Sequence, residues 1–175
     1  NREEPPGNIR AFNALTGEFE WRFHTIPLEG QPGYETWEWE DNMNYGGANS
    51  WGGFTVDEER GWVFGATGAA TGGIHGNGGA RPGKNLYSNS VLAIDAETGV
   101  LQWHFQTIHH DIWDYDIAPA PMLATITKDD GTKQDVVVQT GKQGKVFIFD
   151  RETGESLFPI VEKPVPTEAA PGEVP

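Results

Sequence analysis

The segment from His109 to Asp116 gathers two His and three Asp within eight positions, next to Trp113 and Tyr115. Carboxylates and imidazoles set against large aromatic rings are typical of sites that need a base with a shifted pKa or oxygen ligands for a cation. A single Asp or His in such a place is more often a turn cap or a hydrogen-bond partner. The cluster as a whole indicates a functional site.

Two further residues have side chains suited to a binding site. Trp51 is followed by Gly52 and Gly53, and glycines beside an indole let another flat ring approach the backbone closely. The alternative is that Trp51 is a core aromatic. Lys142 lies in the glycine-flanked turn Gly141–Lys145, where its cation either serves a site or belongs to the ordinary surface.

Composition limits the function classes. The chain has 175 residues, 37% of them hydrophobic, with seven Trp and nine Phe, which is enough for a packed core. Its formal net charge of −14 disfavours nucleic acid and anionic membrane surfaces as partners. No stretch approaches the roughly 20 apolar residues that span a bilayer. The absence of Cys excludes disulfides and thiolate ligands.

An internal repeat is the strongest sign of architecture. Residues 10–26, RAFNALTGEFEWRFHTI, match residues 92–108, LAIDAETGVLQWHFQTI, position by position. A third copy, VFIFDRETGESLF at 146–158, has Phe158 where the others have Trp21 and Trp103. Each copy has Asn or Asp opening a turn and Gly closing it, which predicts a β-hairpin. Hairpins that recur along a chain with one aromatic each predict an all-β, propeller-like fold.

Other segments agree with an all-β fold. No segment has a convincing helical pattern, and the glycine-rich stretch 65–85 is expected to run over one face as a loop. Further strands are expected at 51–56, turning through 57–61 into 62–64, and at 135–139, leading into 146–150. The Pro- and Glu-rich tail from residue 163 onward is expected to be extended.

These motifs together resemble the quinoprotein dehydrogenases that use pyrroloquinoline quinone. The stretch QTIHHDIWDYDIAPAPMLATI, and GKQGKVFIFDRETGE followed by EKPVP, are similar to the glucose and alcohol dehydrogenase branch, and the match runs from about residue 9 to 166. The resemblance implies part of an eight-bladed β-propeller with tryptophan-docking motifs. We expect a partial propeller of about three blade repeats at 1–166 and a Pro/Glu-rich tail at 167–175.

The resemblance also implies roles for single residues. Asp114 corresponds to the catalytic base, Trp51 to the aromatic floor under the quinone, and Lys142 to the cation that contacts the quinone oxygens. Asp114 and Asp116 would both face the metal ion, because alternation along a strand puts residues two apart on the same side. The ion is calcium in most of the family, and a second carboxylate at this spacing selects a lanthanide in one branch.

Two features depart from a simple transfer of roles. The family commonly has a metal-binding Asn at the position of Ala69, which offers only its backbone carbonyl, and His75 and Asn77 in the glycine-rich loop are no obvious replacement. His109 and His110 would point to opposite faces of a strand, so at most one faces the site, and we expect neither to be catalytic.

The implied function is oxidation of a sugar or alcohol hydroxyl, with hydride transfer to the quinone and electrons passing to a separate quinone or cytochrome acceptor. Relatives work in the periplasm, and membrane association of the parent stays open. The alternative is a non-catalytic propeller scaffold that has lost full metal ligation, which Ala69 favours. Because three repeats cannot close an eight-bladed ring, we expect a fragment that is inactive alone.

Overall fold

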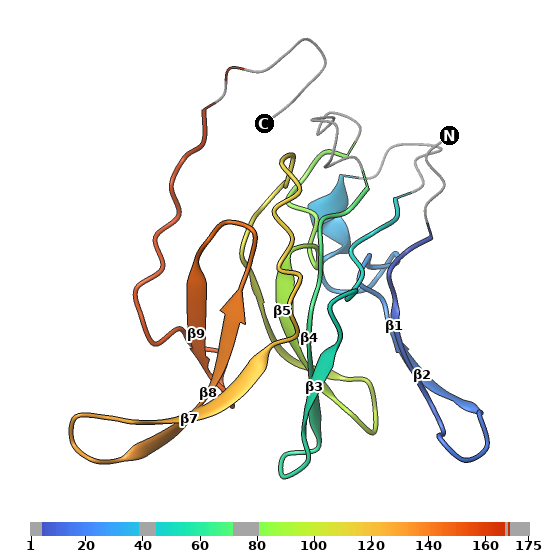
Figure 1. The fold of residues 1–175 in the computed structure, drawn as a ribbon. Coiled ribbons are helices and arrows are strands. Elements are labelled where there is room, and N and C mark those ends of the chain that lie inside the picture. Colours follow the sequence, from blue (N-terminus) through green and yellow to red (C-terminus); the bar gives the residue numbers. More distant parts are fainter. Residues whose placement is uncertain (1–4, 39–44, 72–80, 167, 169–175) are drawn as a thin grey trace.

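The computed structural model describes residues 5–38, 45–71, 81–166 and 168, and over these ranges the regular structure is almost entirely β. Three antiparallel sheets follow one another along the chain (Figure 1). They have two, four and three strands: β1 (Ile9–Phe12) and β2 (Phe19–Phe23); β3 (Phe54–Asp57), β4 (Trp62–Ala66), β5 (Ser90–Asp95) and β6 (Leu101–Gln106); and β7 (Met122–Thr127), β8 (Lys133–Thr140) and β9 (Val146–Asp150).

Several predicted boundaries change. The first strand of the second sheet begins at Phe54, so Trp51 lies in the connection before it. Strand β8 is longer than predicted, and β7 was not predicted. No α-helix occurs in the described ranges, but a 3-10 helix, η1 (Tyr34–Trp37), lies in the β2–β3 connection, with Trp37 buried.

The three repeat turns have the same local chemistry. In each, the side-chain oxygen of the opening Asn or Asp accepts hydrogen bonds from the backbone N–H groups two and three positions on, at 2.8–3.1 Å. The closing glycines, Gly17, Gly99 and Gly154, have φ of 74°, 75° and 73°. A left-handed φ favours glycine, so the sequence sets these turns locally.

The third copy is only partly a hairpin. Strand β9 forms, but the return segment makes one isolated bridge, from Ser156 to Phe149, in place of the predicted second strand. Pro159 stands where the second copy has His104 of β6. Proline has no N–H to donate, so the ladder cannot continue through that position.

Each tryptophan of the repeat docks on the turn of the next copy. Trp21 Nε1 donates to the Ala96 carbonyl at 2.9 Å, and Trp103 Nε1 donates to the Arg151 carbonyl at 3.0 Å. A Cβ placed on Gly99 or Gly154 would lie 2.7 or 2.6 Å from these indoles. The glycines therefore serve twice, in closing the turn and in receiving the ring.

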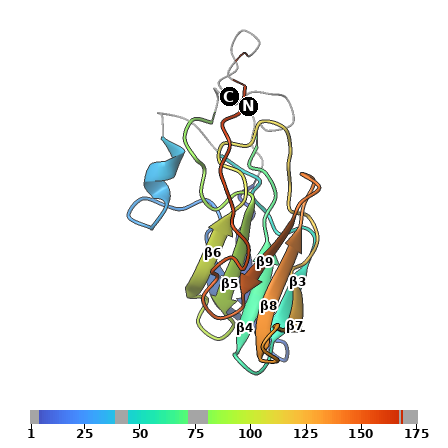
Figure 2. The ribbon, with the colours of Figure 1, turned by 90° about the vertical axis from the view of Figure 1, so that its left-hand side faces the viewer.

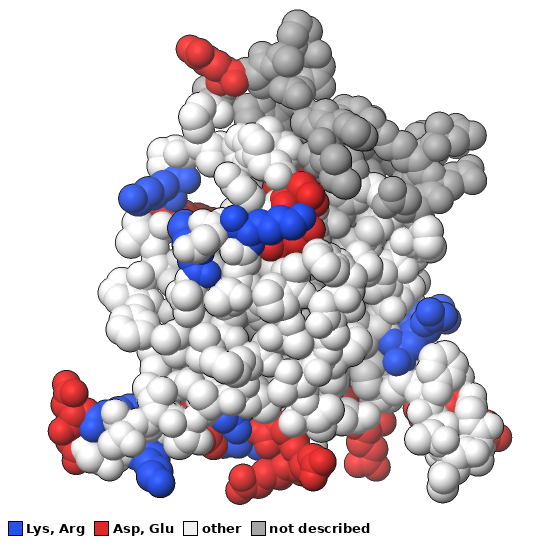
Figure 3. All heavy atoms as spheres, in the orientation of Figure 1, with Lys and Arg blue, Asp and Glu red and all other residues white. Residues whose placement is uncertain are grey.

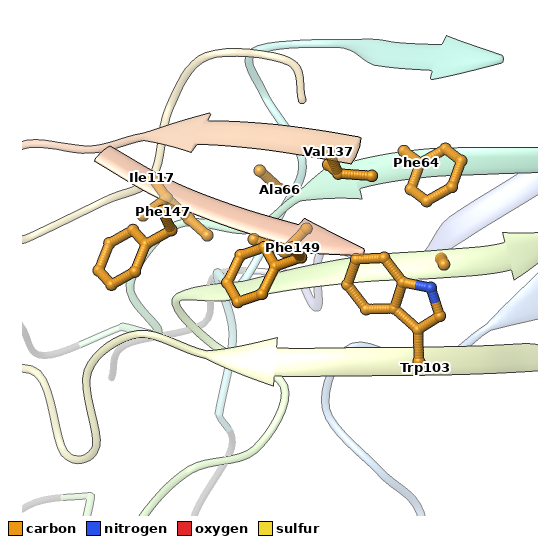
Figure 4. Packing of buried hydrophobic residues seen from close by; sticks show 9 residues of the cluster. Phe64, Ala66, Trp103, Ile117, Val137, Phe147 and Phe149 are labelled. Atoms are coloured by element: carbon orange, nitrogen blue, oxygen red, sulfur yellow. The ribbon is translucent and has the colours of Figure 1, made fainter. Parts of the chain in front are cut away.

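The main core lies between the second and third sheets, which stand side by side in both ribbon views (Figures 1 and 2). Aromatic rings from both sheets meet there, and the centroids of Trp103 and Phe149 are 5.9 Å apart (Figure 4). The buried members are Phe64, Ala66, Val91, Ala93, Trp103, Ile117, Val137, Phe147 and Phe149.

Successive connections alternate between the two ends of the sheets. The turns β1–β2, β3–β4, β5–β6 and β7–β8 lie at one end, here named the hairpin end (Figure 1). The connections β2–β3, β4–β5, β6–β7 and β8–β9 lie at the other, here named the site end. Trp51, Ala69, Asp114 and Lys142 each belong to a different site-end connection, so the topology brings their backbones to one side of the sheets.

Candidate functional site

The segment that carries the acidic cluster is irregular, whereas the sequence suggested a strand. Strand β6 ends at Gln106 and β7 begins at Met122, with no strand between them. Two residues within it, His110 and Asp114, have left-handed φ of 51° and 60°. Strand alternation is therefore the wrong reason for expecting Asp114 and Asp116 to face one ion.

The two carboxylates nevertheless converge, because Lys142 bridges them. Lys142 Nζ lies 2.7 Å from Asp114 Oδ2 and 2.6 Å from Asp116 Oδ2. The Lys142 backbone N–H also donates to the Asp116 carbonyl at 3.0 Å. The hydrogen bonds to Asp114 and then to Asp116 raise the pKa of Lys142 above its ordinary value, so its ammonium stays charged at neutral pH.

Asp116 is the buried member of the pair, with 7% of its surface exposed. Its Oδ1 accepts a hydrogen bond from the Ala69 backbone N–H at 2.5 Å. A Cβ on Gly68 would lie 2.5 Å from Asp116 Oδ1 and 3.0 Å from Trp51 Nε1. Only glycine at position 68 therefore lets the Trp51 indole and the Asp116 carboxylate come this close together.

Trp51 is a surface residue, and its interpretation as a core aromatic is wrong. Its exposed fraction is 56%, although its neighbours are tightly packed. A Cβ on Gly52 would lie only 1.4 Å from the Ala118 carbonyl oxygen, just beyond Asp116. The backbone beside Trp51 therefore packs tightly against the acidic segment, while more than half of the residue's surface stays exposed.

The oxygen ligands for a metal ion are few in the described part of the chain. No group of three His, Cys, Asp or Glu side chains comes together there. The Ala69 carbonyl already accepts from the Ala48 N–H at 3.0 Å. Asp114 and Asp116 remain as a pair, with the Lys142 ammonium between them. His75 and Asn77 lie outside the described residues.

Both histidines of the cluster have partners away from Lys142. His109 Nδ1 lies 2.9 Å from Gln106 Oε1, and its Nε2 lies 2.8 Å from Glu162 Oε1. His110 Nδ1 lies 2.9 Å from the Gly83 carbonyl. The opposite-face argument does not apply, because neither residue lies on a strand; hydrogen bonding holds both rings instead.

Sequence reasoning missed the residues that shape the segment. Asp111 is fully buried and accepts hydrogen bonds from the Trp113 and Tyr115 N–H groups. The contacts of Asp111 with these two N–H groups could have been predicted from the sequence, because an Asp that accepts from the N–H two residues on is a common turn opener. Arg81 and Asn89, which hold Asp111 from 30 and 22 residues away in sequence, had no such signal.

Charge is unevenly spread over the surface. On the face shown in Figure 3, acidic and basic side chains gather along the lower edge, over the hairpin end, and much of the middle carries no charged side chains. Basic and acidic side chains touch near the upper part of this face, over the site end. At both ends the chain pairs opposite charges, even though acidic residues dominate its composition.

The fold and the site define this chain as a segment of a β-propeller with a charged, aromatic-sided site at one end of its sheets. The family model for the β-propeller domain of glucose, ethanol and alcohol dehydrogenases that use pyrroloquinoline quinone matches residues 1–175. The chain belongs to this family, which confirms both the resemblance and the fold class. No helix within the described ranges is long and apolar enough to cross a membrane.

Similar proteins and solved structures support the same family assignment. The chain is 38% identical to the quinoprotein glucose dehydrogenase of Escherichia coli K12 over 97% of its length, and 34% identical to the quinate/shikimate dehydrogenase (quinone) of Acinetobacter baylyi, also over 97%. These alignments cover 21% and 20% of those proteins, so the chain spans about a fifth of their length. A quinohemoprotein alcohol dehydrogenase structure from Pseudomonas putida HK5 superposes with a TM-score of 0.76 at 29% identity, covering 89% of this chain and 24% of that one.

Proposed function

We propose that the complete protein to which this chain belongs oxidises a sugar or alcohol hydroxyl with pyrroloquinoline quinone as its hydride acceptor. One observation carries the proposal: Lys142 bridges Asp114 and Asp116 beside the exposed indole of Trp51. These residues come from three separate connections, and together they offer an acid–base group, a fixed cation and a flat apolar surface.

The residues present fit a planar, polyanionic quinone. The indole of Trp51, an exposed residue, would carry the quinone ring system by stacking, and the ammonium of Lys142 would contact the quinone oxygens. When bound, the quinone supplies a carbonyl carbon that accepts a hydride. Lys142 then places a positive charge where negative charge develops, which lowers the barrier electrostatically.

Asp114 is the proposed general base. Its side chain is one-third exposed, so a substrate hydroxyl can reach it, and its Oδ2 is held 2.7 Å from Lys142 Nζ. The ionised carboxylate is the form of an Asp side chain that accepts a proton. Asp114 would take the hydroxyl proton on a carboxylate oxygen as the carbon–hydrogen bond breaks.

The proposed metal site uses Asp114 and Asp116. Both carboxylates form an ion pair with the Lys142 ammonium, so the space between them favours a positive charge. Calcium takes six to eight oxygen ligands, so the described residues supply only part of its shell. A metal ion at this pair would compete with Lys142 for the same oxygens. Calcium is the proposed ion, with a lanthanide as the second possibility because both carboxylates converge.

The remaining parts of the proposal concern the complete protein. Residues 1–166 would form about three blade repeats of its propeller, and 167–175 a Pro/Glu-rich tail. Electrons would leave to a quinone or cytochrome acceptor, with the enzyme in the periplasm and open to membrane association. The names of the relatives, dehydrogenases of glucose, quinate or shikimate, and glycerol, support a hydroxyl-bearing substrate class.

A non-catalytic scaffold is the second candidate, and Ala69 is the observation that favours it. Position 69 has no side-chain oxygen to offer, and its backbone N–H and carbonyl already have partners in Asp116 and Ala48. A scaffold of this kind would keep the docked tryptophans and the core but would not bind the quinone productively.

The test is a titration of tryptophan fluorescence with pyrroloquinoline quinone, with and without calcium or lanthanum, after circular dichroism has shown a folded protein. It is run on the complete protein and on this chain. Saturable quenching that is lost in Trp51→Ala and kept in Trp113→Ala supports the cofactor site, because Trp113 is also exposed. A folded complete protein that neither quenches nor turns over substrate would instead favour the scaffold.

A further inference from the structure

Asp111 is a buried carboxylate to which the proposed reaction assigns no part. Its Oδ1 accepts a hydrogen bond from the Trp113 N–H at 2.9 Å. Its Oδ2 accepts from the Tyr115 N–H at 2.7 Å and from Asn89 Nδ2 at 2.9 Å. With none of its surface exposed, Asp111 accepts three hydrogen bonds, two of them from the N–H groups on either side of Asp114.

A second buried polar side chain fixes the backbone at the same point. The guanidinium of Arg81, 1% exposed, donates to the Asp111 carbonyl and to Asn85 Oδ1, and its Nε donates to the Thr71 carbonyl at 2.9 Å. Burying two charged groups is costly unless hydrogen bonds and opposite charge offset it. Here both compensations are present, because the two charges have opposite sign and both groups are hydrogen-bonded.

Asn89 joins this cluster to the rest of the site end. Its Nδ2 donates both to Asp111 Oδ2 and to the Tyr115 carbonyl, at 2.9 and 3.0 Å. Its backbone N–H donates to the carbonyl of Gly68, the residue that packs next to Asp116 and Trp51. Its own carbonyl accepts from the Thr107 N–H. Asn89 has a left-handed φ of 48°, a conformation that Asn tolerates better than most residues.

The geometry points to Asp111 as a positioning residue for Asp114 and Asp116. Asp114 sits between the two amides that Asp111 holds, in a left-handed conformation that is unfavourable for a residue with a Cβ. Anchoring the N–H group on each side of it forces this turn. The turn directs both carboxylates to Lys142. The inference rests on the proposed function for the part that Asp114 plays in the reaction.

The main test is Asp111→Asn in the complete protein. A carboxylate accepts from all three N–H donors, whereas an amide has one oxygen, so at least one donor must then face an NH2 group. Hydrogen–deuterium exchange that resolves single amides should show Trp113 or Tyr115 exchanging about tenfold faster or more, with the sheets unchanged. The matched control is Asp130→Asn, an exposed turn carboxylate that accepts from Thr132 in the β7–β8 turn.

Asp111→Ser is the second variant. It allows the inference to be tested even if Asp111→Asn does not fold. A hydroxyl can still accept from the N–H two residues on, as in a serine turn, but cannot also reach Tyr115 and Asn89. Faster exchange is then expected at Tyr115 and not at Trp113. A merely structural role would instead raise exchange throughout the sheets.

Activity provides the independent reading. A displaced base should lower kcat about ten- to a hundredfold, with the bound quinone and KM unchanged. Unaltered exchange at both amides in folded variants would overturn the inference, and so would faster exchange with wild-type kcat. If Asp114→Asn keeps full activity, the proposed base is wrong, while the exchange result still decides whether Asp111 holds the turn.

Discussion

The hairpin end and the site end are stabilised in different ways. At the hairpin end the three repeat turns are each satisfied within five residues, by an Asn or Asp cap and a left-handed glycine. At the site end the partners are far apart in sequence: Ala69 with Asp116, Lys142 with Asp114. Local hydrogen bonds shape the repeat turns, whereas long-range contacts build the site, so changes in the two places should have separable effects.

The largest expected effect is on activity and comes from the site end. Asp114→Asn keeps the size and one acceptor for Lys142 but removes the proposed base, so turnover of the complete protein should fall about 10²- to 10⁴-fold. The midpoint of urea unfolding should hardly move, because exposed ion pairs contribute at most about 1 kcal/mol. Steady-state kinetics and urea titration measure the two effects. Near-normal turnover would remove Asp114 from the mechanism.

The docked tryptophan of the core should show the opposite pattern, a large effect on stability and a small direct effect on the chemistry. Trp103→Ala removes a ring that packs against Phe64 and Phe149, and should lower the free energy of unfolding by about 3–5 kcal/mol. Trp113→Ala, an exposed aromatic at the site end, is the control and should cost far less. Equal losses in the two variants would mean that the two ends are not stabilised differently.

Two glycines allow the stability cost of the turn conformation to be measured apart from that of the contact with the docked tryptophan. Gly17 and Gly154 have nearly the same left-handed φ, 74° and 73°, but a Cβ meets nothing within 4 Å at Gly17 and the Trp103 ring at 2.6 Å at Gly154. Gly17→Ala should cost about 1–2 kcal/mol, for the backbone alone. Gly154→Ala should cost clearly more in thermal or urea unfolding of the chain. A similar cost in both would show that Trp103 can shift without loss.

The same contrast explains what the sequence could predict. Asn13, Asp95 and Asp150 carry their turn signals within a few residues, so the hairpins of the first two copies and strand β9 were predicted correctly. The third hairpin failed because Pro159 interrupts it, a signal that was present but outweighed by the repeat. Strand β7 was missed although its signal was present: Thr125, Ile126 and Thr127 are β-branched, and the Asp130-Gly131 turn follows them closely.

At the site, residue types were easier to predict than geometry. The cluster around Asp114 was visible as a density of carboxylates and aromatics, but its shape depends on the left-handed Asp114 and on Asp111, Arg81 and Asn89. Such contacts join segments that no local pattern relates. The same holds for Ala69, whose N–H contact with Asp116 depends on the β4–β5 and β6–β7 connections meeting.

The smallest expected effect is a pH dependence at the hairpin end, where Asp57, Arg60, Asp135 and Arg151 join the second sheet to the third. Burial opposes ionisation of Asp57, but the Arg60 N–H and the guanidinium groups of Arg151 and Arg60 outweigh it and lower the pKa of Asp57 below 3.8. Its contribution to stability is therefore present above that pH and is lost as the pH falls through the lower pKa of the folded state. In acid titrations followed by circular dichroism, Asp57→Asn should flatten the fall in stability below about pH 4, and Glu58→Gln, on an exposed neighbour, should not. If stability falls below about pH 4 in Asp57→Asn as steeply as in the wild type, tryptophan docking and packing alone hold the two sheets together.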